Sequence, residues 1–424
     1  MREPTKTLVP KLRFLEFKDA REWEEKRLED VCTKISQGGT PDTTNLDYWN
    51  GDVEWLTPAE MGKLETRFIT TTNRKISRAG LKNCSSDLLP IDSVILSTRA
   101  PIGHLLINKS EMAINQGCKG LMSLPSTDHN YLYYILASNK NALADLGAGN
   151  TFKELSGSAL KNFKIKIPKH PEQQKIADCL SSIDALITAQ TQKIAALKNH
   201  KKGLMQQLFP LEGETVPKLR FSEFLDAGDW EADTLVNVAN FRRGSFPQPY
   251  GLPEWYDEIS GMPFVQVFDV SDNLLLKPKT KNKISQLAAE QSVFIPKETV
   301  IITIQGSIGR VAITQYDAYI DRTLLLFERF LKPLNKLFFA YVLQLLFEIE
   351  KQKAPGGIIK TITKEVLSDF EIKFPDINEQ QKIADCLSSV DELITAQIKK
   401  INALKDHKKG LMQQLFPNAD EVGE

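Results

Sequence analysis

The stretch that decides the fold is Glu172–Pro210, EQQKIADCLSSIDALITAQTQKIAALKNHKKGLMQQLFP. It recurs as Glu379–Pro417, EQQKIADCLSSVDELITAQIKKINALKDHKKGLMQQLFP, and only six of the 39 positions differ. In both copies, apolar residues recur at alternating steps of four and three. That spacing is typical of a coiled-coil seam and is narrower than the stripe of a helix lying on a globular core. Each copy therefore predicts one long helix, over residues 171–210 and 378–417.

A glutamine, Gln190 or Gln397, lies in each predicted seam, and such polar residues usually fix the register of paired helices at some cost in stability. Tandem copies related by a two-fold axis would pair antiparallel. The basic runs Lys198–Lys202 and Lys405–Lys409 either offset the helix dipole on a solvated face or contact phosphate or a partner. The seam positions are Ile176, Leu180, Ile183, Ile187, Gln190, Ile194 and Leu197, then Ile383, Leu387, Val390, Ile394, Gln397, Ile401 and Leu404.

The repeat is larger than the helix. VPKLRFLEF at Val9–Phe17 recurs as VPKLRFSEF at Val216–Phe224, and Trp23 recurs as Trp230, all at the offset of 207 that relates the helices. A period this long indicates a duplicated domain pair with pseudo-two-fold symmetry rather than a solenoid. The predicted fold class is α+β, with two α/β domains joined by two long antiparallel coiled-coil helices.

The expected division is a first α/β domain with an N-terminal stub at 1–170, a helix at 171–210, a second α/β domain at 211–377, a helix at 378–417 and a tail at 418–424. The inserts at about 30–150 and 237–353 barely match, although Val94–Gly103 parallels Val300–Gly309. We expect both inserts to share a fold but differ in surface. Strands are expected at 92–98, 163–167, 299–304 and 370–374, and one longer helix near 130–146 and near 334–353.

Composition indicates a soluble globular protein. Hydrophobic residues make up 42% of the chain and charged residues 25%. No apolar run approaches the roughly 18 residues that a membrane span needs. The five scattered cysteines and the lack of a signal-like N-terminus predict reduced thiols and a cytoplasmic location without membrane contact. The net charge is zero, so any DNA-binding surface must be local.

Catalytic motifs are missing from the sequence. It contains no Gly-x4-Gly-Lys-Ser/Thr phosphate loop, no Gly-x-Gly-x-x-Gly and no Asn/Asp-Pro-Pro-Tyr/Phe run, and its five histidines lie at no metal-ligand spacing. We therefore expect no catalytic residue, metal or cofactor in this chain.

The remaining polar chemistry suits DNA. Glycines such as those of Ser36–Pro41 let a backbone approach a ligand closely, arginine pairs well with guanine, and asparagine or glutamine pairs well with adenine. The alternatives are ordinary surface loops and structural salt bridges. The candidates in the first insert are Gln37, Gly38, Gly39, Thr40, Arg99, Asn115, Gln116, Lys119, Thr151 and Lys153. Those in the second are Arg243, Ser245, Gln248, Tyr250, Gln305, Ser307, Arg310, Arg322, Lys360 and Thr361.

The duplicated frame, the PKLRF-x-EF openings, the GGTP, YWNG and EWL runs of the first insert, and the EQQKIA that heads each long helix resemble the specificity subunit of type I restriction–modification enzymes. The resemblance covers nearly the whole chain. It implies that each insert is a target-recognition domain for one half of a bipartite, asymmetric site in double-stranded DNA. It also implies that the paired helices act as a spacer.

The same resemblance implies partners. Two methyltransferase subunits would carry S-adenosylmethionine and methylate adenine, and restriction subunits would add ATP- and Mg-dependent translocation and cleavage. Two alternatives stay open: a solitary DNA-binding or coiled-coil scaffold not tied to restriction, and a self-contained nuclease or methyltransferase.

Overall fold

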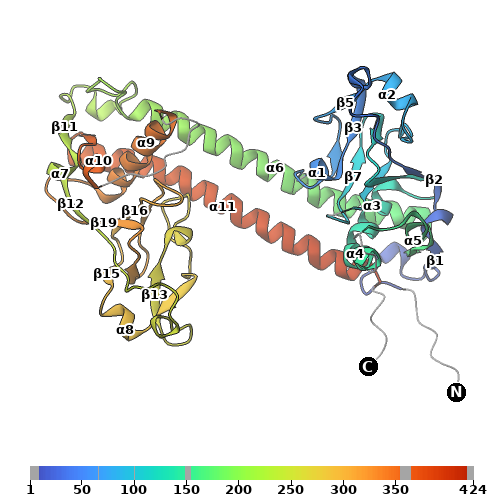
Figure 1. The fold of residues 1–424 in the computed structure, drawn as a ribbon. Coiled ribbons are helices and arrows are strands. Elements are labelled where there is room, and N and C mark those ends of the chain that lie inside the picture. The colour runs from blue at the N-terminus through green and yellow to red at the C-terminus, as the bar shows by residue number, and fades with distance from the viewer. Residues whose placement is uncertain (1–8, 65, 100, 149–153, 354–363, 418–424) are drawn as a thin grey trace. The chain divides into compact units, whose positions relative to one another are not determined.

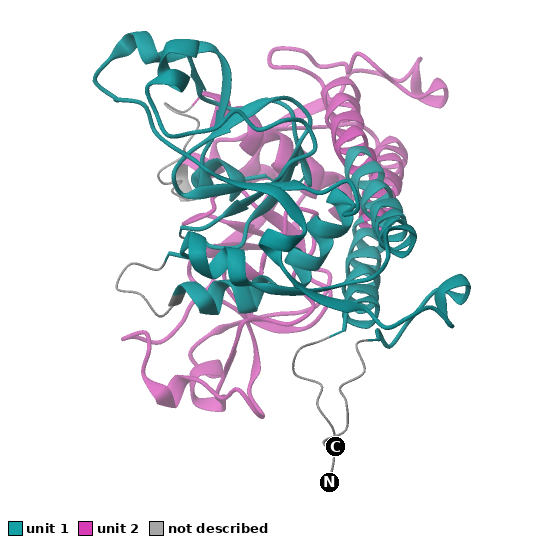
Figure 2. Cartoon of the chain, turned by 90° about the vertical axis from the view of Figure 1, so that its right-hand side faces the viewer, with its two compact units in different colours: residues 1–192, 398–424 teal, residues 193–397 magenta. Residues whose placement is uncertain are grey.

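The computed structural model describes residues 9–64, 66–99, 101–148, 154–353 and 364–417 (Figure 1). The chain forms two compact units, one of residues 1–192 with 398–424 and one of residues 193–397 (Figure 2). Two long helices, α6 (His170–Leu208) and α11 (Ile377–Leu415), each contribute one part to each unit. No helix in the described part of the chain is long and apolar enough to cross a membrane.

Unit 1 contains three sheets. The largest has the strand order β2-β9-β6-β7-β4, and the second has the order β5-β3-β8, in which β3 and β8 are parallel. The third pairs β1 with β10. The strands are β1 (Glu24–Arg27), β2 (Cys32–Gln37), β3 (Trp49–Leu56), β4 (Phe68–Ile69), β5 (Lys75–Ile76), β6 (Val94–Ser97), β7 (Leu105–Asn108), β8 (Met112–Ile114), β9 (Cys118–Ser123) and β10 (Lys164–Ile167). The helices are α1 (Pro58–Met61), α2 (Arg78–Lys82), α3 (His129–Ser138), α4 (Lys140–Ala148) and α5 (Gly157–Asn162).

Unit 2 repeats most of this topology; among the described residues, its first sheet lacks a strand equivalent to β4, and its second sheet has an additional strand, β15. Its sheets have the orders β12-β19-β16-β17, β14-β13-β18-β15 and β11-β20, and β13 pairs with β18 in parallel as β3 pairs with β8. The two inserts therefore share a fold, as the sequence predicted. The strands are β11 (Glu231–Thr234), β12 (Ala239–Arg243), β13 (Met262–Val265), β14 (Asn282–Ile284), β15 (Val293–Ile295), β16 (Val300–Thr303), β17 (Val311–Ile313), β18 (Ala318–Ile320), β19 (Leu324–Phe330) and β20 (Glu371–Phe374). The helices are α7 (Leu235–Val238), α8 (Gln286–Ala289), α9 (Lys336–Lys353) and α10 (Lys364–Ser368).

Most expected elements are present, with one exception. Strands β6, β10, β16 and β20 lie inside their expected ranges, and α9 covers the helix expected in the second insert. The single helix expected near 130–146 is wrong, because α3 ends at Ser138 and α4 begins at Lys140. The side-chain amide of Asn139 donates to the carbonyl of Ile135 at 2.7 Å. This bond satisfies a helix-end acceptor and accounts for the break.

The predicted seam is the least exposed line along both long helices. Every predicted seam residue is buried or half-buried, and most residues between them are exposed. In unit 1, Ile176 and Leu180 near the start of α6 share a core with Leu411 and Leu415 near the end of α11. In unit 2, the start of α11 packs against the end of α6 in the same way, through Ile383 and Leu387 with Leu204 and Leu208. The helices thus pair antiparallel within each unit.

The recurrent stub motif is tied to the head of each helix. Two guanidinium nitrogens of Arg13 donate to the two carboxylate oxygens of Glu172, each at 2.8 Å, and Arg220 binds Glu379 in the same way at 2.8 and 2.7 Å. All four side chains are at most 7% exposed. Bidentate Arg–carboxylate pairs are the strongest and most directional of ion pairs. This contact explains why PKLRF and EQQ recur together.

The first glutamine of each EQQ motif makes equivalent hydrogen bonds in both units. The side chain of Gln173 accepts from the backbone of Asp128 and donates to the carbonyl of Pro168, both at 2.9 Å. Gln380 makes the same two contacts with Asn335 and Pro375, again at 2.9 Å. Both glutamines are almost fully buried. Each therefore satisfies backbone groups that water cannot reach.

Each unit also contains an Asp–Lys–Tyr contact between the two long helices and a shorter one. In unit 1, Lys408 of α11 lies 2.6 Å from Asp184 of α6, and the hydroxyl of Tyr134 of α3 donates to the same carboxylate at 2.6 Å. In unit 2, Lys201 lies 2.7 Å from Asp391, which accepts from Tyr341 at 2.7 Å. Each lysine also lies over the tyrosine ring, with Nζ 5.1 and 4.8 Å from the centroid, within the range of a cation–π interaction. Lys201 and Lys408 of the basic runs are thus used inside the chain.

Removing either carboxylate leaves a poorly solvated lysine without its partner. We expect Asp184→Asn and Asp391→Asn each to lower the free energy of unfolding by about 1–3 kcal/mol. The matched control is Asp178→Asn, an exposed carboxylate on α6. This control is expected to change stability by less than about 0.5 kcal/mol. Chemical denaturation of the full chain measures the effect, and losses no larger than the control's would contradict this role of the Asp–Lys–Tyr contacts.

Candidate nucleic-acid interface

In unit 1, several of the predicted site residues meet at one end of the largest sheet. Gln37, the last residue of β2, lies opposite Lys119 of β9. The backbone of Arg99, two residues after β6, donates to the carbonyl of Gly117 at 3.4 Å, and Gln116 directly precedes that glycine. The side chains of Gln37, Arg99 and Gln116 are exposed. One strand-end cluster therefore gathers an arginine and two amides that could face a ligand.

A hydrogen-bond network holds part of this cluster in place. The amide nitrogen of Asn115 donates to the hydroxyl of Thr40 at 2.8 Å and to the side-chain oxygen of Gln116 at 2.9 Å. The Asn115 oxygen accepts from the backbone of Gly117 at 2.9 Å, and the hydroxyl of Thr40 also donates to Gln116. Preorganised side chains lose less conformational entropy on binding.

The glycines of the same turn have an internal explanation. A Cβ on Gly38 would lie 1.9 Å from the carbonyl oxygen of Asn115, and one on Gly39 would lie 2.6 Å from the backbone nitrogen of Ser85. The backbone of Gly39 already donates to Ile114 at 2.9 Å. Both glycines are buried, so close packing within the unit accounts for them without a ligand.

A polar groove borders the cluster. Gln37 and Lys119 line it together with Lys34, Lys161 and two carboxylates, Glu29 and Asp87, and Lys34 is paired with Asp87 at 2.8 Å. Burial lowers the pKa of Lys119, whose side chain is half-buried. Lys34 and Lys161 were not predicted from the sequence, because neither follows a conspicuous turn or motif. The exposed Arg74, whose guanidinium lies 4.2 Å from the centroid of the Trp49 ring, was missed for the same reason.

Unit 2 has a cluster at the corresponding strand ends. Arg243, the last residue of β12, lies opposite Leu325 of β19. Gln305 follows β16, and the preceding Ile304 donates its backbone N–H to Thr323 at 2.9 Å, next to Arg322. The side chains of Arg243, Gln305 and Arg322 are exposed.

Asp321 organises this second cluster, and it was not predicted from the sequence. The buried carboxylate accepts from the hydroxyl of Tyr250 and from the backbone of Thr323, the latter at 2.8 Å. The guanidinium of Arg322 then lies 5.0 Å from the centroid of the Tyr250 ring. Asp321 occupies the place of Asn115 in unit 1, so a comparison of the inserts at loop level could have found it.

The other predicted residues are dispersed. Ser245 donates its hydroxyl to Gln291 at 3.0 Å, and Gln248 is exposed. Ser307 and Arg310 line a separate groove, in which Arg310 is paired with Asp272 at 3.0 Å. Arg99 in unit 1 is paired similarly, with Glu154 at 3.0 Å, and half of its side chain remains exposed. Thr151, Lys153, Lys360 and Thr361 lie outside the described residues.

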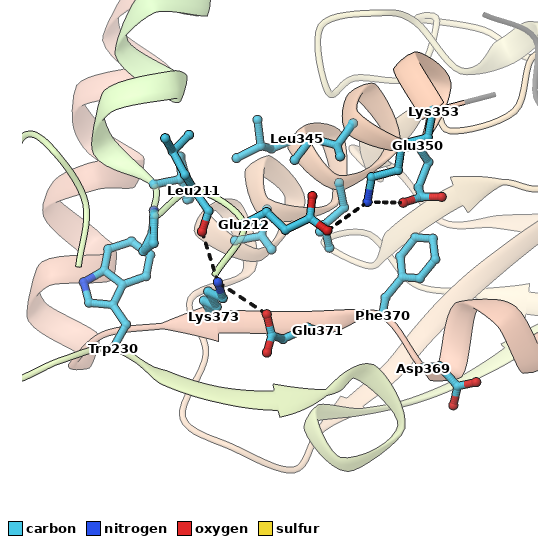
Figure 3. Close-up of a pocket in the computed structure, with 15 residues that line it drawn as sticks. Leu211, Glu212, Trp230, Leu345, Glu350, Lys353, Asp369, Phe370, Glu371 and Lys373 are labelled. Atoms are coloured by element: carbon cyan, nitrogen blue, oxygen red, sulfur yellow. Dashed lines mark hydrogen bonds and ion pairs between the residues drawn. The ribbon is translucent and has the colours of Figure 1, made fainter. Parts of the chain in front are cut away.

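A separate pocket in unit 2 is unsuited to DNA. It lies between α9, β20 and the segment after α6, and Trp230 and Leu345 line it (Figure 3). Its rim holds four carboxylates and two lysines, and the lysines are engaged: Lys353 with Glu212 at 3.3 Å and Lys373 with Glu371 at 3.3 Å. An acidic rim repels phosphate. Among the described residues, no group of three or more His, Cys, Asp or Glu could hold a metal ion.

Comparisons with known proteins agree on one family. The model of the type I restriction modification DNA specificity domain matches twice, at residues 20–199 and 228–405, and so covers more than half of the chain. The MjaIX specificity subunit of a type I restriction enzyme from Methanocaldococcus jannaschii is 32% identical over 257 residues, which are 58% of this chain and 58% of that protein. The putative MjaX specificity subunit of the same organism is 26% identical over 93% of both chains.

A solved structure supports the fold. The type I restriction–modification system S subunit from M. genitalium has a TM-score of 0.59 at 15% identity, covering 97% of this chain and 99% of that one. At this identity the likeness concerns the fold alone. The two matches to the family model decide the assignment: this chain belongs to the type I restriction–modification DNA specificity family and carries two copies of its domain.

Proposed function

We propose that this chain is the sequence-specific DNA recognition subunit of a type I restriction–modification system. Residues 1–170 and 211–377 are its two target-recognition domains, and each reads one half of a bipartite, asymmetric site. The observation that carries this proposal is one fold built twice, with exposed base-reading side chain types at corresponding strand ends. Arginine and amide side chains at such ends suit base edges in the major groove.

The recognition role separates this chain from catalysis. Its family is that of specificity domains, and the curated relatives are specificity subunits, which favours neither a solitary scaffold nor a self-contained enzyme. Methylation and cleavage then belong to other subunits. We propose that two methyltransferase subunits dock on the two copies of the repeated frame, because identical partners need equivalent surfaces. In support, exposed residues such as Lys202 and Gln206 of one copy are identical and equally exposed as Lys409 and Gln413 in the other.

Neutral net charge is compatible with DNA binding in such an assembly. Affinity for duplex DNA depends largely on neutralised phosphates, and a methyltransferase partner can supply much of that charge. In this chain, Lys119 and Lys161 of the groove beside Gln37 are a local source of positive charge, whereas Lys34 of the same groove is paired with Asp87 at 2.8 Å. The candidate contacts named above are proposed to act in recognition, with the buried Gly38 and Gly39 as structural supports.

Exchange of one insert tests the two-reader proposal. If residues 30–150 are replaced by the insert of another family member, one half of the methylated sequence is expected to change and the other half to persist. The reason is that the base-reading side chains of each half-site come from one domain. Sequencing of methylated adenines in cells that carry the hybrid and its methyltransferase measures both halves at once, and a change in both would sink the proposal.

Lengthening the helices tests the proposed spacer. Two readers of one duplex must sit about 34 Å apart or a multiple of it, and we propose that paired helices set that separation. Adding one heptad to α6 and one to α11 keeps the seam in register and adds about 10 Å of helix. The tolerated gap between half-sites is expected to lengthen while both half-sites persist. An unchanged gap in the methylated motif would show that the helices do not set it.

A further inference from the structure

The two strand-end clusters correspond residue by residue. The frame repeats at an offset of 207, but the strand ends repeat at 206: Gln37 corresponds to Arg243, and Ser97 corresponds to Thr303. The registers agree, because Ser97 lies opposite Cys118 and Thr303 lies opposite Leu324, again 206 residues apart. The sequence offset therefore corresponds to a structural equivalence.

The turn after β6 and β16 is built the same way in both units. The hydroxyl of Ser97 donates to Pro101 at 2.8 Å and accepts from the backbone of His104 at 2.9 Å. In unit 2, the hydroxyl of Thr303 donates to Ser307 at 2.6 Å and accepts from the backbone of Arg310 at 2.9 Å. Each turn ends on a glycine of positive φ, +91° at Gly103 and +84° at Gly309. Arg99 and Gln305 thus occupy equivalent positions in equivalent turns.

The turn after β2 and β12 matches as well. A Cβ on Gly38 would meet the carbonyl oxygen of Asn115, and one on Gly244 would meet that of Asp321, 1.9 and 2.4 Å away. The backbone N–H of Gly39 donates to Ile114 in unit 1, and that of Ser245 donates to Ile320 in unit 2. These contacts fix Gln37 with Arg243, and Gln116 with Arg322, as equivalent pairs.

At each of the three exposed positions defined in this way, one unit carries a glutamine and the other carries an arginine. Unit 1 carries Gln37, Arg99 and Gln116, and unit 2 carries Arg243, Gln305 and Arg322. The backbone contacts that fix these positions are the same in both units. A requirement of the fold would favour the same residue type twice, so the alternation indicates a function that differs between the units.

We propose that these three equivalent positions are the specificity-determining residues of each recognition domain, an inference that rests on the proposed function. Glutamine offers a donor and an acceptor that match the major-groove edge of adenine, and arginine offers two donors that match guanine. The first recognition domain, residues 1–170 (domain 1), therefore reads A·T, G·C and A·T base pairs with Gln37, Arg99 and Gln116. The second, residues 211–377 (domain 2), reads G·C, A·T and G·C base pairs with Arg243, Gln305 and Arg322.

The surrounding contacts suit this role. The side-chain oxygen of Gln116 accepts from Asn115 and Thr40, so one of these bonds is exchanged for the N6–H donor of adenine when DNA binds. Arg322 is held over the Tyr250 ring, which orients its guanidinium before DNA arrives. Arg99 is paired with Glu154, but both side chains remain partly exposed. An exposed ion pair contributes little net stability and exchanges readily for a base.

The test exchanges the triad of one domain for that of the other. The variant Gln37→Arg, Arg99→Gln, Gln116→Arg is made in the full chain and purified with its methyltransferase partner. Bound sequences are then selected from a duplex library randomised over the parent's own site. The control Arg78→Gln removes an exposed arginine of the same unit that belongs to α2 and to none of the three strand-end positions. Thermal unfolding confirms that both variants fold like the parent.

The expected result is confined to the half-site of domain 1. At the contacted base pairs, the preference moves from A·T to G·C under each new arginine and from G·C to A·T under the new glutamine, by roughly 5- to 150-fold each. The half-site of domain 2 and the Arg78→Gln selection stay as in the parent. Should the triple variant lose all binding, the single variants Gln37→Arg and Gln116→Arg are each expected to change one base pair.

An unchanged half-site in a variant that binds would overturn the proposal, as would an equal loss over all sequences, which indicates phosphate contact or solvated surface. Single variants that leave every base preference unchanged would also overturn the proposal. Failure of the proposed function looks different, because the parent complex itself would then enrich no sequence.

Discussion

The pairing of one helix start with the other helix end is the constraint on which each unit depends. In unit 1 the start of α6 meets the end of α11 through buried seam residues and through the contact of Asp184 with Lys408 and Tyr134. Unit 2 uses Asp391, Lys201 and Tyr341 in the same way. Neither unit is built from one repeat alone, because each core needs the helix end of the other copy. This reciprocal requirement explains why the frame repeats almost unchanged.

The repeated frame allows the strand ends to differ between the units. Arg13–Glu172 and Arg220–Glu379 hold the stub to each helix head, and most of the sheet topology is repeated in both inserts. The exposed ends of the central strands then differ in side chain without disturbing the backbone beneath, as Gln37 and Arg243 illustrate. If the strand ends read DNA as proposed, stability and recognition reside in different residues, and a change of recognised sequence need not alter the fold.

The sequence predicted the features that periodicity or repetition marks, and it missed side-chain contacts between residues far apart in the chain. The seam, the antiparallel pairing and the shared insert fold were predictable, because periodicity and a long repeat report them directly. The break at Asn139 was missed, since an asparagine inside an apolar pattern is a weak stop signal. The separation of 159 positions between Arg13 and Glu172 concealed the buried ion pair, and Asp321 has no motif around it. The parallel of Val94–Gly103 with Val300–Gly309 already matched Arg99 with Gln305, but the equivalence of Gln37 with Arg243 and of Gln116 with Arg322 needed the strand registers.

The central claim is that one chain presents two unlike readers of DNA. Base-resolved sequencing of methylated adenine in a host that carries this chain with its methyltransferase partner tests it most directly. We predict a single asymmetric motif with two unlike half-sites separated by a fixed gap of unspecified bases. A contiguous motif, a palindromic one, or methylation without any sequence preference would contradict it.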